Sequence, residues 1–258
     1  MKRIIGMLAL AALLITPSLA FAEQIGVYVA PKFVYGYTQM QRMKAPGVYD
    51  SGTPISIPSN KIGNKTDNAF GGALAIGYDF NKKFQVPVRA ELEYAIFSEV
   101  SGKRSWDGNY PFFDGVPSNN NVSTKQKLQI QTLFVNAYYD FRNSTAFTPW
   151  VGAGLGMAFI NSKGNFFFDD PGYDPDEHFG LSLSSKTSTN FAWNVGAGVA
   201  YDFTSNISLD LGYRFAGLGK AETKSATGEN GYNEFLTAKA KTSNVYMHQL
   251  MLGLRFTF

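Results

Sequence analysis

The stretch NFAWNVGAGVAYDF, residues 190–203, alternates between two kinds of side chain with a period of two residues. One set of positions begins at Phe191 and Trp193, continues through small aliphatic residues, and ends at Tyr201 and Phe203. The other set carries Asn, Ala, Gly and finally Asp202. Successive side chains of a β-strand point to opposite faces. The stretch therefore predicts a strand with one apolar face, aromatic at both ends, and one face of small or polar residues.

The same alternation recurs along the whole chain and predicts an all-β protein of eight strands. The predicted strands are 25–39, 69–80, 86–98, 124–141, 147–160, 187–203, 207–218 and 244–258. In 124–141 the apolar phase shifts after Leu128 and Ile130, which predicts a bulge near Gln131–Thr132.

The connections between these strands alternate in length. Segments 81–85, 142–146 and 204–206 are short, whereas 40–68, 99–123, 161–186 and 219–243 are long and rich in Gly, Asn and Ser. Loops of about 25 residues are often functional. The alternation predicts antiparallel hairpins with one trimmed end and one elaborate end.

The triplet Tyr-Asp-Phe closes three of the predicted strands, each just before a short connection. Its acids are Asp79, Asp140 and Asp202. The alternation places each Tyr and Phe on the apolar face and each Asp on the other. We therefore expect the three aspartates to lie at about one height on the inside of a barrel.

The first 22 residues have the pattern of a signal peptide. Met1-Lys2-Arg3 is basic, residues 4–15 are apolar, and Ala-Phe-Ala at 20–22 fits a cleavage site. Cleavage would leave a single domain, 23–258, and would lower the formal net charge from +3 to +1. The scattered Lys and Arg residues then give no reason to expect nucleic acid as a partner. The chain has no cysteine, so disulfides do not stabilise it.

Either face of such a barrel could point outward. A soluble lipocalin-like carrier would place the apolar phase inside and charges outside. Here the second phase is poor in large solvated side chains and rich in Gly, Ala and Ser, which suits a narrow lumen. The apolar phase, with aromatic ends, suits lipid and its interfaces. Because backbone groups in lipid must all be paired, we expect an eight-stranded antiparallel transmembrane up-and-down β-barrel.

The C-terminus, LMLGLRFTF (250–258), keeps one apolar phase up to Phe258. This ending, together with YVAPKFVYGYTQ (28–39), TPWVGAGLGMAF (148–159) and LDLGYRF (209–215), resembles the OmpA-like and opacity-protein family of eight-stranded outer-membrane surface antigens. The resemblance covers the predicted strands but not the long connections.

This resemblance implies a location in the outer membrane of a Gram-negative bacterium, with periplasmic termini and extracellular long loops. It implies a non-enzymatic surface protein that supports the envelope and adheres through its four loops. The expected partners are outer-membrane lipid, lipopolysaccharide and a host or surface ligand. Phe256 and Phe258 would form the signal that the barrel-assembly machinery recognises.

With the apolar phase outward, the lumen receives four cations and six anions. They are Lys32, Arg89, Arg214 and Arg255, and Asp79, Glu91, Glu93, Asp140, Asp202 and Asp210. Because buried charges must be paired or neutralised, we predict an interlocked salt-bridge network without an open water column. The alternative is a small porin-like transport channel with a gated ion pathway.

The sequence offers little basis for catalysis, and we predict no enzyme, cofactor or metal. The acidic segment 166–180 contains Asp176 and His178, but paired acids on facing strands, as in outer-membrane proteases, are missing. Its five acids match no EF-hand spacing, which favours a solvated loop over a calcium site. His248 shares the phase of Leu250 and is expected at the membrane interface.

Aromatic residues cluster in the second and third long connections. They are Trp106, Tyr110, Phe112, Phe113, Phe166, Phe167, Phe168 and Tyr173. An exposed apolar cluster often marks an interaction surface. The alternative is that the loops pack on each other or that the strands extend beyond the membrane.

Overall fold

The structure is a computed structural model of the chain. It describes residues 25–50, 52, 54–57, 63–110, 118–169, 178–229 and 235–258. The predicted signal peptide, 1–22, lies outside the described residues. Across the described ranges, no helix is long and apolar enough to cross a membrane.

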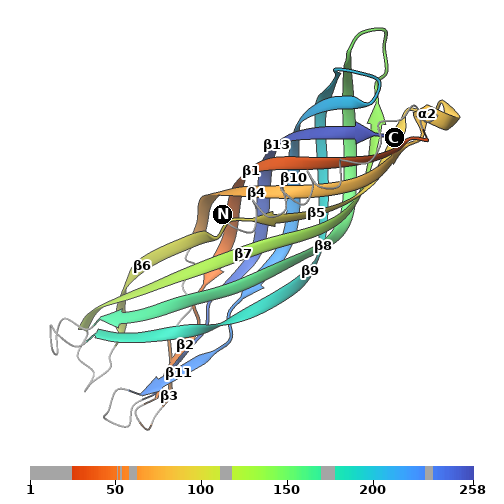
Figure 1. Cartoon of the computed structure of the whole chain (residues 1–258). Coiled ribbons are helices and arrows are strands. Elements are labelled where there is room, and N and C mark those ends of the chain that lie inside the picture. The colour runs from red at the N-terminus through yellow and green to blue at the C-terminus, as the bar shows by residue number, and fades with distance from the viewer. Residues whose placement is uncertain are drawn as a thin grey trace.

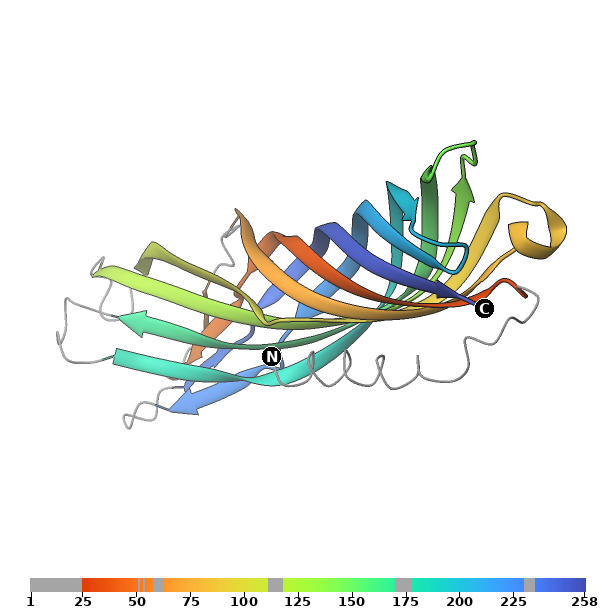
Figure 2. The same ribbon diagram turned by 45° about the horizontal axis from the view of Figure 1, so that its top comes forward.

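Nine strands form one closed antiparallel barrel (Figures 1 and 2). They are β1 (Val27–Lys44), β4 (Gly63–Asp79), β5 (Val88–Phe97), β6 (Val100–Tyr110), β7 (Ser118–Asp140), β8 (Phe147–Asp169), β9 (His178–Asp202), β10 (Ile207–Glu222) and β13 (Lys241–Thr257). Their order is β5-β4-β1-β13-β10-β9-β8-β7-β6, and β5 also pairs with β7. Since β5 and β6 follow each other along one side of β7, the barrel has eight positions, which confirms the predicted fold.

The two ends of the barrel differ, as the connections predict. The short helix α2 (Asn81–Phe84) and the other short connections lie at the end where β13 finishes (Figure 1). At the opposite end β7, β8 and β9 run for 23, 23 and 25 residues, well beyond their predicted bounds. Much of the second and third long connections is therefore strand.

The first and fourth long connections contribute a second, small sheet. Its strands are β2 (Gly47–Asp50), β3 (Pro54–Ile57), β11 (Ala226–Glu229) and β12 (Phe235–Ala238). Their order is β11-β12-β2-β3, so that the β12–β2 pairing joins the two connections. These four-residue strands are too short to produce a detectable alternation of side chains.

The predicted bulge near Gln131–Thr132 is wrong. The register between β7 and β8 runs without a shift from Asn121 to Asp140. The irregularity lies on the neighbouring strand, at residues 98–99 where β5 gives way to β6. Leu128 and Ile130 are fully buried in the barrel interior, because the interior at that level is apolar.

Polarity reverses along the barrel and divides it into two halves. In the turn half, which carries the short connections, the outer face is apolar: Val135 is 62% exposed and Leu155 is 60% exposed. Along β7 and β9 the outer side chains then change from Leu133 to Gln131 and from Phe191 to Thr189. Beyond this change lies the long-strand half, whose outer face is polar.

The interior of the long-strand half is a mainly apolar core. The largest fully buried side chains there are Phe166, Met40, Met43, Leu128, Ile130, Ile160 and Leu218. One polar layer crosses this core, in which Gln126 bonds to Ser162 at 2.7 Å and accepts from Thr242 at 2.8 Å. This half is thus built like a water-soluble β-protein, with apolar residues inside and polar residues outside.

Two seams open in the long-strand half. The β9–β10 ladder ends at Trp193 and Gly217, and the β4–β5 ladder ends at Gly71 and Phe97. Beyond these points β4, β1, β13 and β10 form one group, and β6 to β9 form another, with the core between them. Side chains bridge the seams: the Asn190 amide donates to the carbonyl oxygen of Lys220 at 2.8 Å. The backbone there turns at Gly219, whose φ of 83° favours glycine.

Candidate functional site in the barrel interior

The interior of the turn half holds all ten predicted lumen charges. At its core, Glu93 lies between Lys32 and Arg214, with both cations 2.7 Å from a carboxylate oxygen. Lys32 also pairs with Glu91. All four side chains are nearly or fully buried. The stagger of inward positions on β1, β5 and β10 brings these groups together, although they are distant in sequence.

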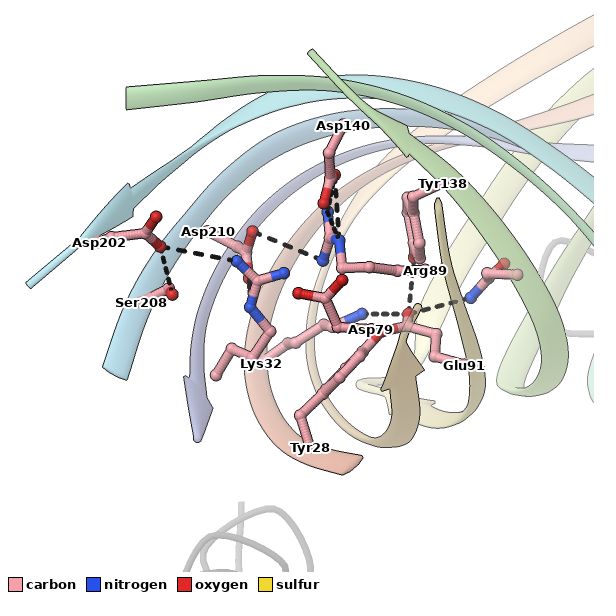
Figure 3. A network of polar contacts seen from close by, with 12 residues as sticks. Tyr28, Lys32, Asp79, Arg89, Glu91, Tyr138, Asp140, Asp202, Ser208 and Asp210 are labelled. Atoms are coloured by element: carbon pink, nitrogen blue, oxygen red, sulfur yellow. Dashed lines mark hydrogen bonds and ion pairs between the residues drawn. The ribbon is translucent and has the colours of Figure 1, made fainter. Parts of the chain in front are cut away.

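A second cluster lies closer to the short connections (Figure 3). The Arg89 guanidinium donates two hydrogen bonds of 2.9 Å to the Asp140 carboxylate, in a bidentate arrangement. It also lies 3.9 Å from Asp210. Arg255 approaches Asp210 at 3.6 Å and Asp202 at 4.0 Å.

Sequence reasoning missed Arg142. Its guanidinium donates to Asp79 at 2.7 Å and to Asp140 at 3.2 Å, and so joins two of the triplet acids. Arg142 lies in a short connection, where period-2 alternation gives no inward or outward assignment. One sequence signal could have indicated its role: Arg142 is a cation directly after the second triplet. The other two triplets are followed by the uncharged residues Asn81 and Thr204.

Neutral residues complete the network around Glu91. The hydroxyl of Tyr138 donates to it at 2.6 Å, that of Tyr28 at 3.2 Å, and the amide of Asn136 at 3.2 Å. Tyr138 shares the phase of Asp140, which could have placed it in the lumen. The alternation does not predict its contact with Glu91, because that contact depends on the register of strands around the barrel.

Small residues make room for this packing. A Cβ atom built on Gly198 would lie 2.5 Å from the Trp150 ring, and one on Gly212 would lie 2.6 Å from it. Trp150 in turn packs edge-on against Tyr138, with ring centroids 5.2 Å apart. The many glycines of the inner face thus allow large lumen side chains to meet across a narrow barrel.

Each Tyr-Asp-Phe triplet spans the wall of the barrel. Asp79, Asp140 and Asp202 are the last residues of β4, β7 and β9. The Tyr and Phe of each triplet contact each other edge-on, with centroids 4.9, 5.1 and 5.0 Å apart. The acids are not equivalent: Asp79 and Asp140 are buried, whereas the Asp202 side chain is 39% exposed.

Apolar side chains fill the lumen above the charges. Phe97, Phe134 and Met247 are buried there, next to the core of the long-strand half. Between Lys32, Tyr138 and Asp210 a cavity of about 20 Å³ remains, enough for one or two water molecules. The lumen of the turn half is thus occupied by paired charges and then by hydrocarbon.

The predicted loop aromatics have different outcomes. Phe166 is fully buried, so it is not an exposed interaction residue: β8 continues through this segment, as in the strand-extension alternative, and directs the side chain into the core. Phe167, the next residue, points outward and is 41% exposed. Trp106 and Tyr110 belong to β6 and Phe168 to β8, but their side chains lie outside the described part, as do Phe112, Phe113 and Tyr173 entirely.

The two histidines also differ. His178 begins β9, but its side chain and all of Asp176 lie outside the described part, so the Asp-His pair does too. His248 lies on the outer face between β1 and β10. Its Nδ1 is 2.7 Å from the Tyr213 hydroxyl and its Nε2 is 3.2 Å from the Gln39 amide. This position, among rings at the edge of the apolar belt, fits an interfacial residue.

Two further predictions concern metal binding and the C-terminus. Among the described residues no group of three or more His, Cys, Asp or Glu is arranged for a metal. The acidic segment 170–177 is outside them. Phe258 exchanges backbone hydrogen bonds with the start of β1, donating to Val27 at 2.8 Å and accepting from Gly26 at 3.0 Å. The C-terminal strand thus closes the barrel, and its role as an assembly signal stays a prediction.

The chain is similar to several known proteins. Residues 7–258 match the family described as outer membrane protein beta-barrel domain. The outer membrane protein PagN of Salmonella typhimurium is 35% identical over 197 residues, which are 76% of this chain and 75% of PagN. A putative adhesin of Rickettsia canadensis is 25% identical over 227 residues, 87% of each chain.

The crystal structure of Neisserial surface protein A aligns with a TM-score of 0.42 at 19% identity, covering 90% of this chain and 97% of that one. The chain therefore belongs to the outer membrane protein beta-barrel domain family, and it is a β-barrel protein of the Gram-negative outer membrane.

Proposed function

We propose that this protein is a non-enzymatic surface protein that supports the envelope and adheres to other surfaces. The turn half lies in the membrane, with both termini and the short connections in the periplasm. The long-strand half projects outside the cell. The observation that carries this proposal is that the interior is blocked between its two ends, by paired charges and then by an apolar core. The surfaces left to act are the outer ones.

The outer faces support the orientation. The apolar belt of the turn half is the only medium-facing surface that suits lipid among the described residues, and aromatic side chains border it at both edges. The short connections lie at one edge and the long strands at the other. In bacterial outer-membrane barrels the short turns are periplasmic and the long loops extracellular.

The alternative of a transport channel has less support. An eight-stranded barrel has a lumen only wide enough for side chains. Here Phe97, Phe134 and Met247 occupy it directly beyond the Lys32–Glu93–Arg214 cluster. An ion would have to displace buried ion pairs and then cross hydrocarbon, and both steps are unfavourable. The charge network is therefore proposed to be structural.

The histidine contacts support a non-enzymatic role. Both ring nitrogens of His248 are occupied, by Tyr213 and by Gln39, in a cluster of aromatic rings. A general base needs a free nitrogen within reach of its substrate. His248 is proposed to help anchor the barrel at the outer edge of the lipid, next to lipopolysaccharide.

Adhesion is assigned to the tips of the two long hairpins, β6–β7 and β8–β9. Their strands β7, β8 and β9 are the longest that the structure describes, at 23, 23 and 25 residues. Phe167 shows that an aromatic side chain on this stem can face solvent. The candidate contact residues are Trp106, Tyr110, Phe112, Phe113, Phe167, Phe168 and Tyr173. One relative points the same way, since it is named a putative adhesin.

Adhesion by whole cells tests the proposal. The protein is produced in a non-adherent Gram-negative strain, and binding to cultured epithelial cells is counted. In one variant, short Gly-Ser turns replace residues 111–117 and 170–177. The matched control carries a Gly-Ser turn in place of 143–146, at the opposite end, and keeps Arg142 with its contacts to Asp79 and Asp140. The first variant should lose adhesion and the control should keep it, with equal amounts of heat-modifiable barrel on gels.

Conductance separates the adhesive role from the channel. The purified protein in planar bilayers should give no reproducible discrete openings. Openings of constant size would support the transport alternative. Adhesion that survives removal of both tips would contradict the adhesive role.

A further inference from the structure

A polar cavity opens at the turn end of the lumen, and no part of the adhesive role uses it. It has a volume of about 160 Å³ and lies between the ends of β4, β9, β10 and β13 and the short connections. Its lining includes three cations, Lys82, Arg142 and Arg255, and two carboxylates, Asp79 and Asp202. The volume exceeds what one water needs by far, so several water-sized groups fit.

One nitrogen of the Arg255 guanidinium lacks a hydrogen-bond acceptor among the described residues. Its side chain is only 7% exposed, yet its distances to the nearest carboxylates, 3.6 Å to Asp210 and 4.0 Å to Asp202, exceed hydrogen-bond length. Its Nη1 is buried and has no hydrogen-bond partner within the described part of the chain. Arg89, by contrast, holds Asp140 through a bidentate pair. A buried guanidinium without an acceptor is costly, which indicates that something else accepts from Arg255.

Three of the four carboxylate oxygens of the cavity wall accept hydrogen bonds. One oxygen of Asp79 accepts from Arg142 at 2.7 Å, and the other accepts from the backbone N–H of Asn81 at 2.9 Å. Asp202 accepts from the Ser208 hydroxyl at 2.6 Å. The free hydrogen-bonding capacity of the cavity is therefore mainly that of donors, and it favours an acceptor as occupant.

Lys82 is another cation of the cavity wall. It projects from α2, and its Nζ donates to the carbonyl oxygen of Ser205 at 3.1 Å. Partial burial lowers the pKa of Lys82; Asp79 and Asp202 raise it, and the positive charges of Arg142 and Arg255 lower it. A negative group in the cavity would offset this repulsion.

We propose that the cavity binds a small oxyanion, a carboxylate or a phosphate, which accepts hydrogen bonds from Arg255 and Lys82. A carboxylate or a phosphate has two or more oxygens that can accept hydrogen bonds from the planar, forked donors of a guanidinium group. The ligand is either a free anion or the terminal carboxylate of a peptide that reaches the open end of the barrel. The site itself does not depend on adhesion, and only its assignment to the periplasmic side rests on the proposed orientation.

Calorimetric titration of the full mature barrel, folded in zwitterionic detergent at constant ionic strength, tests the site. The probes are inorganic phosphate, acetate, and one tripeptide with either a free or an amidated C-terminus. At least one oxyanion probe should bind saturably at one site. Lys82→Met should weaken that binding about tenfold, as expected for loss of about 1.4 kcal/mol. Arg255→Gln should abolish it.

Lys83→Met is the matched control. Lys83 is on the same helix, but its Nζ lies over the Phe84 ring, 5.8 Å from the centroid, and it does not line the cavity. Binding by this variant should equal that of the unmodified protein. If Arg255→Gln does not fold, the pair of Lys82 and Lys83 variants decides.

The probes also identify the source of the ligand. Binding of the free-acid peptide but not its amide assigns the site to a peptide terminus. Binding of phosphate or acetate alone assigns it to a free anion. The proposal is overturned if no probe binds saturably, since the cavity then holds water only, or if Lys82→Met and Lys83→Met bind equally well. Neither result affects the adhesion assay.

Discussion

Glu93 and Glu99 lie six positions apart on one side of the barrel, and each carboxylate sits between two cations. Glu93 is fully buried between Lys32 and Arg214, inside the turn half. Glu99 lies on the outer face of the long-strand half, 2.7 Å from Lys127 and 3.0 Å from Lys163, with its side chain 37% exposed. The local chemistry is similar, but one group is enclosed by protein and lipid and the other borders water.

The difference shows how one set of strands can serve two media. In the turn half, lipid outside favours apolar outer side chains, so the charges lie within. In the long-strand half, water outside favours polar outer side chains, so hydrocarbon fills the interior. Along β7 and β8 the pleat continues unbroken from one half to the other, and only the medium on the outer side changes. Between β5 and β6 the extra residue at 98–99 shifts the alternation, so that Glu99 faces outward although Glu93 faces inward.

The largest expected effect is that of Glu93→Gln. The change leaves Arg214 without its carboxylate in a buried site, where removing one partner costs about 3–5 kcal/mol. The measure is the free energy of unfolding in lipid vesicles by chemical denaturant. Glu99→Gln is the matched control and should cost less than about 1 kcal/mol, as for exposed pairs. Equal costs for the two variants would show that the halves do not differ in burial of charge.

The apolar interior of the long-strand half is tested by Leu128→Ala. This side chain is fully buried, and its truncation should cost about 2–5 kcal/mol because a cavity remains. Leu155→Ala, on the outer face of the turn half, should cost less, because lipid chains can fill the space. The same unfolding measurement applies. A smaller loss for Leu128→Ala than for Leu155→Ala would mean that the long-strand half has no stabilising core.

A lysine introduced on the outer face tests whether the two halves border different media. Val135→Lys puts an ammonium group in the middle of the apolar belt and should cost about 2–4 kcal/mol. Gln129→Lys, farther along the outer face of β7, borders water and should change stability by less than about 0.5 kcal/mol. Folding yields in vesicles and unfolding midpoints give both values. If Val135→Lys is tolerated as well as Gln129→Lys, the boundary of the lipid lies elsewhere.

The smallest expected effect is the pH dependence of the surface pair. The hydrogen bond from Lys127, supported by Lys163, holds the pKa of the Glu99 carboxyl below its usual range. A lowered folded-state pKa stabilises the fold fully above the usual glutamate value of about 4.3, and this contribution is lost as the pH falls through the lower value. The stability difference between the unmodified protein and Glu99→Gln should thus be present at pH 7 and vanish toward pH 3. A difference that grows on acidification would have the wrong sign.

Several features could be predicted from the sequence, because period-2 alternation indicates strands and the two faces of each strand. The eight strands, the outward apolar phase and the inward position of the ten lumen charges follow from it. Arg142 was not accessible, since alternation says nothing about a turn. The contacts of Glu91 were not accessible either, because they depend on the stagger between strands that are far apart in sequence.

In most strands the sequence by itself determined which side chains share a face, because the pleat assigns every second residue to the same side. It failed in 124–141, where Leu128 and Ile130 are apolar but lie inside. What each face meets was decided only by the tertiary structure. The same inward phase of β7 carries Asp140 among charges and Leu128 in an apolar core, and the same reasoning turns Phe166 inward and Phe167 outward. The physical reason is that the strands outrun the membrane: burial depends on the medium and on the neighbours across the barrel, and neither is encoded in a local alternation.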